Sequence, residues 1–248
     1  MRANTTGTQN VAVGYEAGRN NTSGGPFTFV GYQAGFNKGD NGSGEGTAVG
    51  YQALYASGGP LRNTAVGYQA LYATTNQGDS NTGVGYKALV ANTTGYSNVA
   101  VGSLCLDACT TGIENTAMGQ SAMTALTTGQ YNTAVGQAAS KDLTTGESNT
   151  CVGVNAGIAL TTGSNNLILG TNSGRSSAPS GDITTGSNNV CLGNNSISNL
   201  FCADTSISSS DSRDKTDVTS FNIGLAWINA LRPVTYRWDR SCLLYTSD

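Results

Sequence analysis

The residues best suited to chemistry lie near the end of the chain, in the run Ser210-Asp211-Ser212-Arg213-Asp214-Lys215. This run gathers hydroxyls, carboxylates and two cations directly after a Ser-rich stretch that has no regular pattern. A serine hydroxyl becomes a useful nucleophile only when a neighbouring base activates it. Because the chain contains no histidine, the base most often used for this purpose is absent.

The other groups that commonly perform chemistry give little support for a second site. Cys151 and Cys191 stand where a repeat described below usually has alanine, and Cys105 replaces another small residue, so we expect small buried thiols. Cys105 and Cys109 form a single Cys-x-x-x-Cys pair without a second pair, so we expect no metal and no cofactor. The acidic residues of the repeats stand singly, which predicts no pair of carboxylates for glycoside hydrolysis.

The composition excludes two classes of partner. Only 11% of the 248 residues are charged, the formal net charge is −3, and there is no run of Lys or Arg. Such a surface has no electrostatic attraction for nucleic acid or for an anionic membrane. No apolar stretch approaches the length of a transmembrane helix. We therefore expect no nucleic-acid partner and no membrane insertion.

The part of the chain before Ser210 consists mostly of a repeat. The phrase Asn-Thr-Ala-Val-Gly recurs with variations, and its glycine returns at intervals of 17 to 23 residues. The eleven glycines are Gly14, Gly31, Gly50, Gly67, Gly85, Gly102, Gly119, Gly136, Gly153, Gly170 and Gly193. A fixed period in this range predicts a solenoid, whose coils bury their apolar faces only against one another. We therefore expect a mainly β fold, a β-solenoid or β-roll of about eleven 17-residue repeats.

Each position of the repeat has a predicted role, counting the residue four places before the glycine as position one. Position four is apolar in every unit, and position eight is small. Strand alternation puts positions two and four on one side and position three, mostly Ala, on the other. We expect position three to face away from the core, where only neighbouring chains packed around an axis could cover it. Seven units also carry Thr-Thr-Gly, which predicts a turn whose glycine is free to take positive φ.

Two columns of the repeat could present side chains to a partner. Tyrosine follows the repeat glycine only in the first five units, at Tyr15, Tyr32, Tyr51, Tyr68 and Tyr86. The sequence leaves open whether these rings stack to stabilise adjacent coils or form a strip that faces a receptor. Asn occupies position one in nine units, which predicts a hydrogen-bonded ladder rather than a set of ligands.

The repeat phrase resembles the head repeat of trimeric autotransporter adhesins and the related repeats of phage tail fibres. The resemblance covers about 190 residues. It implies a parallel homotrimer of β-rolls, a number of chains that the period alone does not provide.

The sequence pattern changes after the last repeat. The expected parts are a repetitive solenoid over residues 1–203, a Ser-rich linker over 204–209, the start of another domain over 210–240, and a non-native tail over 241–248. In the third part we expect a short helix through Trp227 that ends before Pro233, followed by a strand over Val234–Trp238. Because the repeat begins close to Met1 without an atypical capping unit, we expect an N-terminally truncated fragment.

The order of residues from Ser209 to Trp238 closely resembles the start of the C-terminal intramolecular chaperone of phage tail spikes and fibres, a self-cleaving peptidase family. The run Leu231-Arg232-Pro233-Val234-Thr235-Tyr236 belongs to this resemblance. The resemblance implies that Ser210 and Lys215 form a Ser/Lys dyad and that the chain is cut between Ser210 and Asp211.

The implied dyad is chemically consistent with the residues present. Burial can lower the pKa of a lysine enough for the neutral amine of Lys215 to serve as the base. Attack of Ser210 on its own carbonyl would close a four-membered ring, so Ser210 would act on a neighbouring chain or activate a water molecule, and both routes stay open. Arg213 is expected to anchor the fold or a carboxylate such as Asp211. The alternative is that residues 210–215 are only a polar junction between a linker and a helix.

These features together predict a structural and receptor-binding segment of a virion tail fibre, made in the host cytoplasm. Its chaperone would drive trimerisation and then be removed. The expected partners are the sister chains and a host receptor, with glycans among the candidates. The alternatives are a trimeric adhesin of the bacterial cell surface, and the fibre of a glycan-degrading tail spike whose catalytic domain lies elsewhere. We expect at most one self-cleavage per chain, and none in this chain, because only 38 residues follow Ser210.

Overall fold

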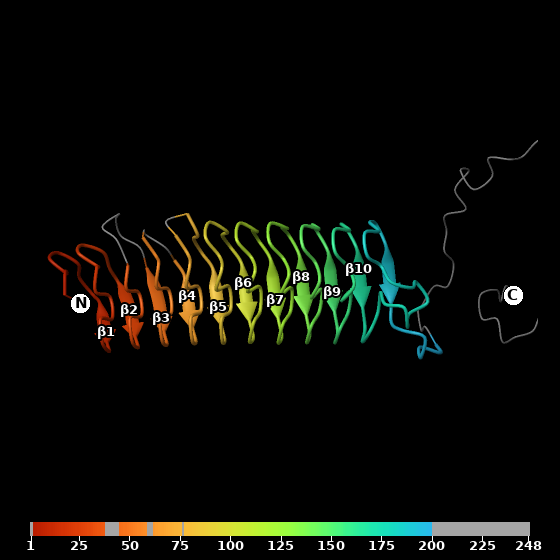
Figure 1. The fold of residues 1–248 in the computed structure, drawn as a ribbon, viewed down its shortest axis with the longest axis horizontal. Helices are drawn as coiled ribbons and strands as arrows, with labels where there is room; N and C mark the ends of the chain where they lie inside the picture. The colour runs from red at the N-terminus through yellow and green to blue at the C-terminus, as the bar shows by residue number, and fades with distance from the viewer. Residues whose placement is uncertain (1, 38–44, 59–61, 76, 200–248) are drawn as a thin grey trace, which may run out of the picture. The chain divides into compact units, whose positions relative to one another are not determined.

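The repeats fold into a single parallel sheet that winds along one axis. The structure, a computed structural model, describes residues 2–37, 45–58, 62–75 and 77–199. Its strands are β1 (Val11–Val13), β2 (Phe27–Val30), β3 (Gly46–Val49), β4 (Thr64–Val66), β5 (Thr82–Val84), β6 (Val99–Val101), β7 (Thr116–Met118), β8 (Thr133–Val135), β9 (Thr150–Val152), β10 (Leu167–Leu169) and β11 (Val190–Leu192). They pair in chain order from β1 to β11, one strand per coil (Figure 1). The expected parallel β-solenoid is confirmed.

The strands stack in register, so equal positions of successive repeats lie over one another. Thr64 pairs with Thr47 in the coil before and with Thr82 in the coil after, and the position-four valines pair in the same way. The compact unit formed by these coils spans Met1–Ser198, and the second unit, Asn199–Asp248, lies almost wholly outside the described residues. The expected helix and strand after residue 210 lie there too. No helix occurs among the described residues.

Position three of the repeat lies inside the coil. Ala65, Ala100 and Ala134 are fully buried, whereas Val11 at position two and Met118 at position four are 50% and 44% exposed. The expectation that position three faces away from the core is therefore wrong. Alternation along a strand defines two faces without saying which one is inner. Here the inner face carries the small residues, and the β-branched residues form the outer face.

The interior holds a limited side-chain volume, and the turns supply most of it. Where position three carries the larger Phe29, Gly35 faces it, and a Cβ added to Gly35 would lie 2.6 Å from the ring. Elsewhere the buried leucines come from position nine or position twelve of the repeat. They are Leu54, Leu71, Leu89 and Leu106 at position nine, and Leu126, Leu143 and Leu160 at position twelve. Alanine in the strand leaves the space that these leucines fill.

The repeat glycine at position five is required for two physical reasons. Gly67 has φ +137°, a conformation that residues with a side chain rarely adopt. A Cβ at Gly67 would also lie 2.3 Å from the carbonyl oxygen of Gly85 in the next coil. The strand therefore ends at a point where successive backbones come too close for any side chain.

The glycines of the Thr-Thr-Gly turns are needed only because neighbouring atoms lie too close there for a side chain. None of the seven takes a positive φ, so the expectation that they would do so is wrong. A Cβ at Gly95 would lie 2.3 Å from the carbonyl oxygen of Gly112 in the next coil and 2.4 Å from Oδ1 of Asn92. The turn is tight against its neighbours while its backbone stays in an ordinary region.

Positive φ instead occurs at residues with side chains, at positions seven and nine and at the residue directly before position one, such as Ser97 with φ +57°. Gln69 and Leu71 both have φ +53°. The amide of Gln69 donates to the carbonyl oxygen of Tyr51 in the preceding coil at 2.9 Å, and the amide of Leu71 donates to that of Ala88 in the following coil at 3.0 Å. The left-handed residues thus turn alternate amides toward the two neighbouring coils. The strain of the left-handed backbone is offset by hydrogen bonds that continue from coil to coil along the axis.

The position-one asparagines form the ladder that the sequence predicts. Asn98, Asn115 and Asn132 are at most 1% exposed. The backbone amide and the side-chain amide of Asn115 both donate to Oδ1 of Asn98, at 3.0 and 3.1 Å. The same side-chain amide donates to the carbonyl oxygen of Gly129 at 2.9 Å. Each asparagine therefore joins the strand to the Thr-Thr-Gly turn of the next coil.

Candidate functional site

The residues of the implied dyad lie outside the described residues. Ser210, Asp211, Arg213 and Lys215 all belong to the segment 200–248. Their arrangement stays a prediction.

The five tyrosines at position six form one continuous stack. The ring centroids of Tyr15, Tyr32, Tyr51, Tyr68 and Tyr86 are 5.1 to 5.4 Å apart, and the interplanar angles are 6° to 16°. The stacking that the sequence proposed is confirmed. The rings are also exposed, from 42% at Tyr51 to 65% at Tyr15. Because each inner ring covers the face of the next, the stack offers ring edges and hydroxyls to solvent rather than open faces.

A row of side-chain amides runs beside the tyrosines at position seven. Nε2 of Gln33 donates to Oε2 of Glu16 at 2.9 Å, and Nε2 of Gln52 donates to Oε1 of Gln33 at 3.0 Å. Gln69 continues the row by donating to Gln52 at 3.0 Å. These bonds hold the side chains that flank the tyrosine stack in fixed positions.

A second aromatic stack lies at position ten, and the sequence analysis missed it. Phe36, Tyr55 and Tyr72 stack with centroids 5.0 Å apart and interplanar angles of 8° and 6°. The guanidinium carbon of Arg19, at the same position of the first coil, lies 5.5 Å from the centroid of Phe36. The signal available in the sequence was an aromatic residue five places after the repeat glycine in three successive units.

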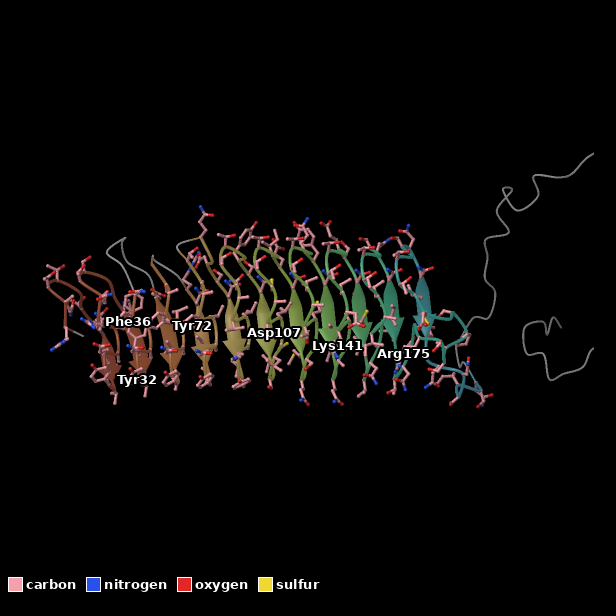
Figure 2. The ribbon with its side chains drawn as sticks, viewed as in Figure 1. Tyr32, Phe36, Tyr72, Asp107, Lys141 and Arg175 are labelled. Atoms are coloured by element: carbon pink, nitrogen blue, oxygen red, sulfur yellow. The ribbon has the colours of Figure 1, made fainter. Side chains whose placement is uncertain are left out.

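Both stacks are confined to the first five coils, with the position-six rings exposed and the position-ten rings half-buried, and we refer to them together as the aromatic surface. We define it as Tyr15, Tyr32, Tyr51, Tyr68, Tyr86, Phe36, Tyr55 and Tyr72. In Figure 2 the row that contains Phe36 and Tyr72 continues along the later coils as Asp107, Lys141 and Arg175. After Tyr72, position ten carries no aromatic residue, and the charged residues alternate with Val90, Thr124 and Ile158. Burial raises the pKa of the Asp107 carboxyl, which is partly covered by its surroundings.

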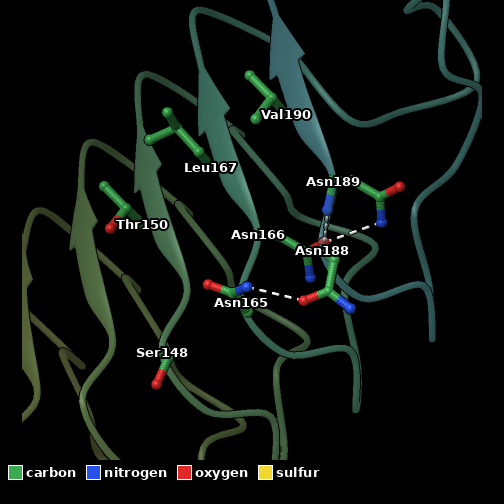
Figure 3. Close-up of a pocket in the computed structure, with 8 residues that line it drawn as sticks. All are labelled: Ser148, Thr150, Asn165, Asn166, Leu167, Asn188, Asn189 and Val190. Atoms are coloured by element: carbon green, nitrogen blue, oxygen red, sulfur yellow. Dashed lines mark hydrogen bonds between the residues drawn. The ribbon is translucent and has the colours of Figure 1, made fainter. Parts of the chain in front are cut away.

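A shallow hollow of about 250 Å³ lies where the strands of the last coils begin (Figure 3). It is lined by Ser148, Thr150, Asn165, Asn166, Leu167, Asn188, Asn189 and Val190. Nδ2 of Asn165 donates to Oδ1 of Asn188 at 2.7 Å, and Oδ1 of Asn166 accepts from both amides of Asn189 at 3.0 and 2.9 Å. None of the lining residues titrates near neutral pH. The hollow can form hydrogen bonds but provides no acid, base or nucleophile of catalytic strength.

A second hollow of about 280 Å³ lies near the start of β3 and β4, and a charged pair stands beside it. Its lining includes Glu45 and Arg62. The guanidinium of Arg62 binds the carboxylate of Asp79 in the next coil and holds the pKa of Asp79 below its usual value. The side chain of Arg62 is mostly exposed and that of Asp79 is half-buried, so water screens the pair and its contribution to stability is small.

The thiols of the described coils are free, buried and unreactive. Cys105, Cys109, Cys151 and Cys191 carry no disulfide, as the sequence predicts for small buried residues. Burial raises the pKa of Cys105 to about 12 and that of Cys109 and Cys151 to about 11. A thiol with such a pKa is almost entirely protonated at neutral pH and is a poor nucleophile. Cys202 and Cys242 lie outside the described residues.

Two absences apply to the part of the chain that the structure describes. No group of three or more His, Cys, Asp or Glu side chains is arranged to hold a metal ion there. The same residues contain no helix long and apolar enough to cross a membrane.

The segment beyond the solenoid matches a known family. A family model described as the chaperone of endosialidase matches residues 210–242. No curated protein and no solved structure matches the chain. The matched segment begins at Ser210, where the predicted chaperone also begins. A parallel β-solenoid followed by a chaperone-of-endosialidase segment fits a tail-fibre-like protein.

Proposed function

We propose that this chain is a segment of a virion tail fibre that adheres to a host receptor. The observation that carries the proposal is the chaperone-of-endosialidase match at residues 210–242, directly after a long repetitive solenoid. Long-range parallel pairing is slow to form, so a fibre of this kind gains from a domain that holds its chains in register while they fold. Removing that domain afterwards would leave the folded fibre kinetically trapped.

The proposal includes three chains packed against one another through the outer faces of their strands. These faces carry positions two and four, because position three is buried in every coil after the first. Apolar side chains on this face are exposed in the single chain, with Val13 at 58% and Leu192 at 46%. They recur in register over the whole length of the sheet. Sister chains would remove this stripe from water, which is the usual reason for chains to associate.

The proposed contact with the host is the aromatic surface of the first five coils. Large exposed aromatic side chains dominate the energy of many protein interfaces. In the later coils the tyrosines of position six give way to residues such as Gln120 and Gln137. The aromatic surface is therefore a discrete patch rather than a property of every repeat.

Truncating the tyrosine stack should weaken attachment to host cells. We expect the combined Tyr32→Ala, Tyr51→Ala and Tyr68→Ala variant, with the chaperone segment in place, to bind at least about a hundredfold less, because aromatic anchors often contribute 1 to 2 kcal/mol each and every 1.4 kcal/mol is a factor of ten. Binding of labelled protein to a panel of bacterial strains measures the effect. The matched control replaces Gln120 and Gln137, at the same position of later coils, with alanine. Equal binding by both variants would place the receptor contact elsewhere.

The implied dyad predicts one cut per chain. A wild-type chain whose chaperone segment is folded should separate into two products by hydrolysis of the bond between Ser210 and Asp211, with one water molecule consumed. The Ser210→Ala and Lys215→Ala variants should stay intact, because the first loses the hydroxyl and the second loses the base. Intact-mass measurement detects the cut.

The neighbouring serine provides the control for this experiment. Ser209→Ala changes the same linker without touching the dyad and should be cut like the wild type. Light scattering on the same preparations should give the mass of three chains. An uncut wild type would remove the peptidase proposal, and a folded monomer would remove the trimer, each independently of the other.

A further inference from the structure

A buried column of the solenoid changes from polar to apolar along the axis. It consists of position twelve, eleven places after the first residue of each repeat. In the third, fourth and fifth coils it carries Ser57, Thr74 and Asn92, all 0% exposed. From the sixth coil it continues as Cys109, Leu126, Leu143 and Leu160, equally buried. The core is therefore polar at this position only near the N-terminal end.

The three polar residues each contain a buried oxygen without a hydrogen-bond partner among the described residues. These atoms are Oγ of Ser57, Oγ1 of Thr74 and Oδ1 of Asn92. Only the amide of Asn92 is paired, by donation to the carbonyl oxygen of Gly95 at 3.0 Å. Because successive parallel strands lie about 4.8 Å apart, the three oxygens follow one another along the axis at roughly that spacing. Three adjacent unpaired oxygens are unusual, since buried polar groups almost always have a partner.

The first coil shows how the same position is satisfied in another setting. Asn21 has the same place in its repeat and is also buried. Its Oδ1 accepts from the amide of Gly24 at 3.2 Å, and its Nδ2 donates to the carbonyl oxygen of Gly24 at 3.1 Å. A polar residue at position twelve can thus be paired within its own turn. Ser57 and Thr74 have side chains too short to bridge the turn in this way.

The seventh coil shows how much side chain the interior can hold. There Met123 and Leu126 are both fully buried, in a coil that has alanine at positions three and eight. The third and fourth coils have the same two alanines and a leucine at position nine, but only Ser57 or Thr74 at position twelve. The fifth coil also replaces the position-three alanine with Gly83. Since the strands run in register, the third to fifth coils enclose less side chain within the same backbone.

We infer that Ser57, Thr74 and Asn92 form an internal hydration site, in which buried water molecules bridge the three side chains. Water can donate to Oδ1 of Asn92 and both donate to and accept from the two hydroxyls. A cation is disfavoured because the three side chains provide no negative charge, and a buried charge without a counter-charge is costly. An apolar guest would leave all three oxygens unpaired. The core is thus hydrated in the third to fifth coils and dry where position twelve is leucine.

The inference is tested on the chain as it stands, with the near-isosteric substitution Thr74→Val. We expect a crystal structure at atomic resolution to show water within hydrogen-bond distance of Oγ of Ser57 and Oγ1 of Thr74. Magnetisation transfer from water to the methyl group of Thr74 by NMR should report the same molecules in solution. In Thr74→Val this transfer should be lost, and the melting temperature should stay equal or fall, because a bridging water loses a partner.

A dry site predicts a different change in the melting temperature. If the site is dry, the hydroxyl of Thr74 is simply unpaired, and Thr74→Val should raise the melting temperature. A rise, or a wild-type core without ordered water, would overturn the inference. The matched control is Thr127→Val, whose Oγ1 donates to the carbonyl oxygen of Thr144 at 3.2 Å and whose loss should lower the melting temperature in either case.

Discussion

Replacing Gly102 with alanine should cost the solenoid about 3 kcal/mol of unfolding free energy or more. Gly102 has φ +142°, a conformation that is nearly exclusive to glycine and strained for other residues by 1 to 3 kcal/mol. The new Cβ would also lie 2.5 Å from the carbonyl oxygen and 2.7 Å from the carbonyl carbon of Gly119. These atoms are backbone, so the next coil must move to make room. The movement breaks the register on which every neighbouring pair of strands depends.

The control for this substitution separates backbone strain from steric clash. Gly181→Ala also introduces a side chain at positive φ, here +66°, but nothing lies within 4 Å of the new Cβ. Its cost should be near the 1 to 2 kcal/mol of an ordinary left-handed residue. Thermal and urea unfolding followed by circular dichroism measure both variants. Equal losses in the two would mean that close packing of the glycine column contributes nothing.

Replacing Asn115 with alanine should be about as damaging as the glycine substitution. Oδ1 of Asn115 accepts from the backbone amide of Asn132 at 3.0 Å and from its side-chain amide at 3.1 Å. Alanine would leave the backbone amide of Asn132 and the carbonyl oxygen of Gly129 buried without partners, while the side-chain amide of Asn132 would keep only its bond of 2.9 Å to the carbonyl oxygen of Gly146. Each unsatisfied buried group costs 1 to 3 kcal/mol, so a loss of roughly 3 to 5 kcal/mol is expected.

An exposed amide provides the matched comparison. Asn165 also belongs to an inter-coil pair, through its bond of 2.7 Å to Asn188, but both side chains reach solvent. Asn165→Ala should change stability by less than about 1 kcal/mol, because water replaces the lost partner. Urea titration of both variants gives the difference. A loss in Asn115→Ala no larger than that in Asn165→Ala would show that the buried ladder does not stabilise the stack.

The stabilising devices differ between the two ends of the solenoid. The first coils combine external aromatic stacks with a core that contains Ser57, Thr74 and Asn92. The later coils have no aromatic stack among the described residues, and their interior holds Leu126, Leu143 and Leu160 instead. The sequence contains both trends, since the tyrosines of position six end at Tyr86 and the position-twelve leucines begin at Leu126. Their complementarity becomes apparent only when the columns are placed inside or outside the coil.

The sequence by itself determined the repeating architecture and its columns. A period of about 17 residues requires equal positions to stack, so the parallel sheet, the tyrosine stack and the asparagine ladder all follow from spacing. The buried thiols follow as well, because cysteine occupies positions otherwise held by alanine. These features depend only on which residues recur at equal spacing, and that spacing can be read from the sequence alone.

Only the tertiary structure decided which side of each strand is inner, and which glycines need positive φ. Val-x-Val alternation is the same whether Ala65 or Val66 points inward, so the sequence could not choose. The choice follows from closure of the coil, because leucines such as Leu71 reach across the interior from the turns and leave room only for alanine in the strand. Closure likewise turns residues such as Gln69 into the left-handed region, where their amides reach the neighbouring coils. Both results depend on contacts between residues that are separated within the repeat and meet only when the coil closes.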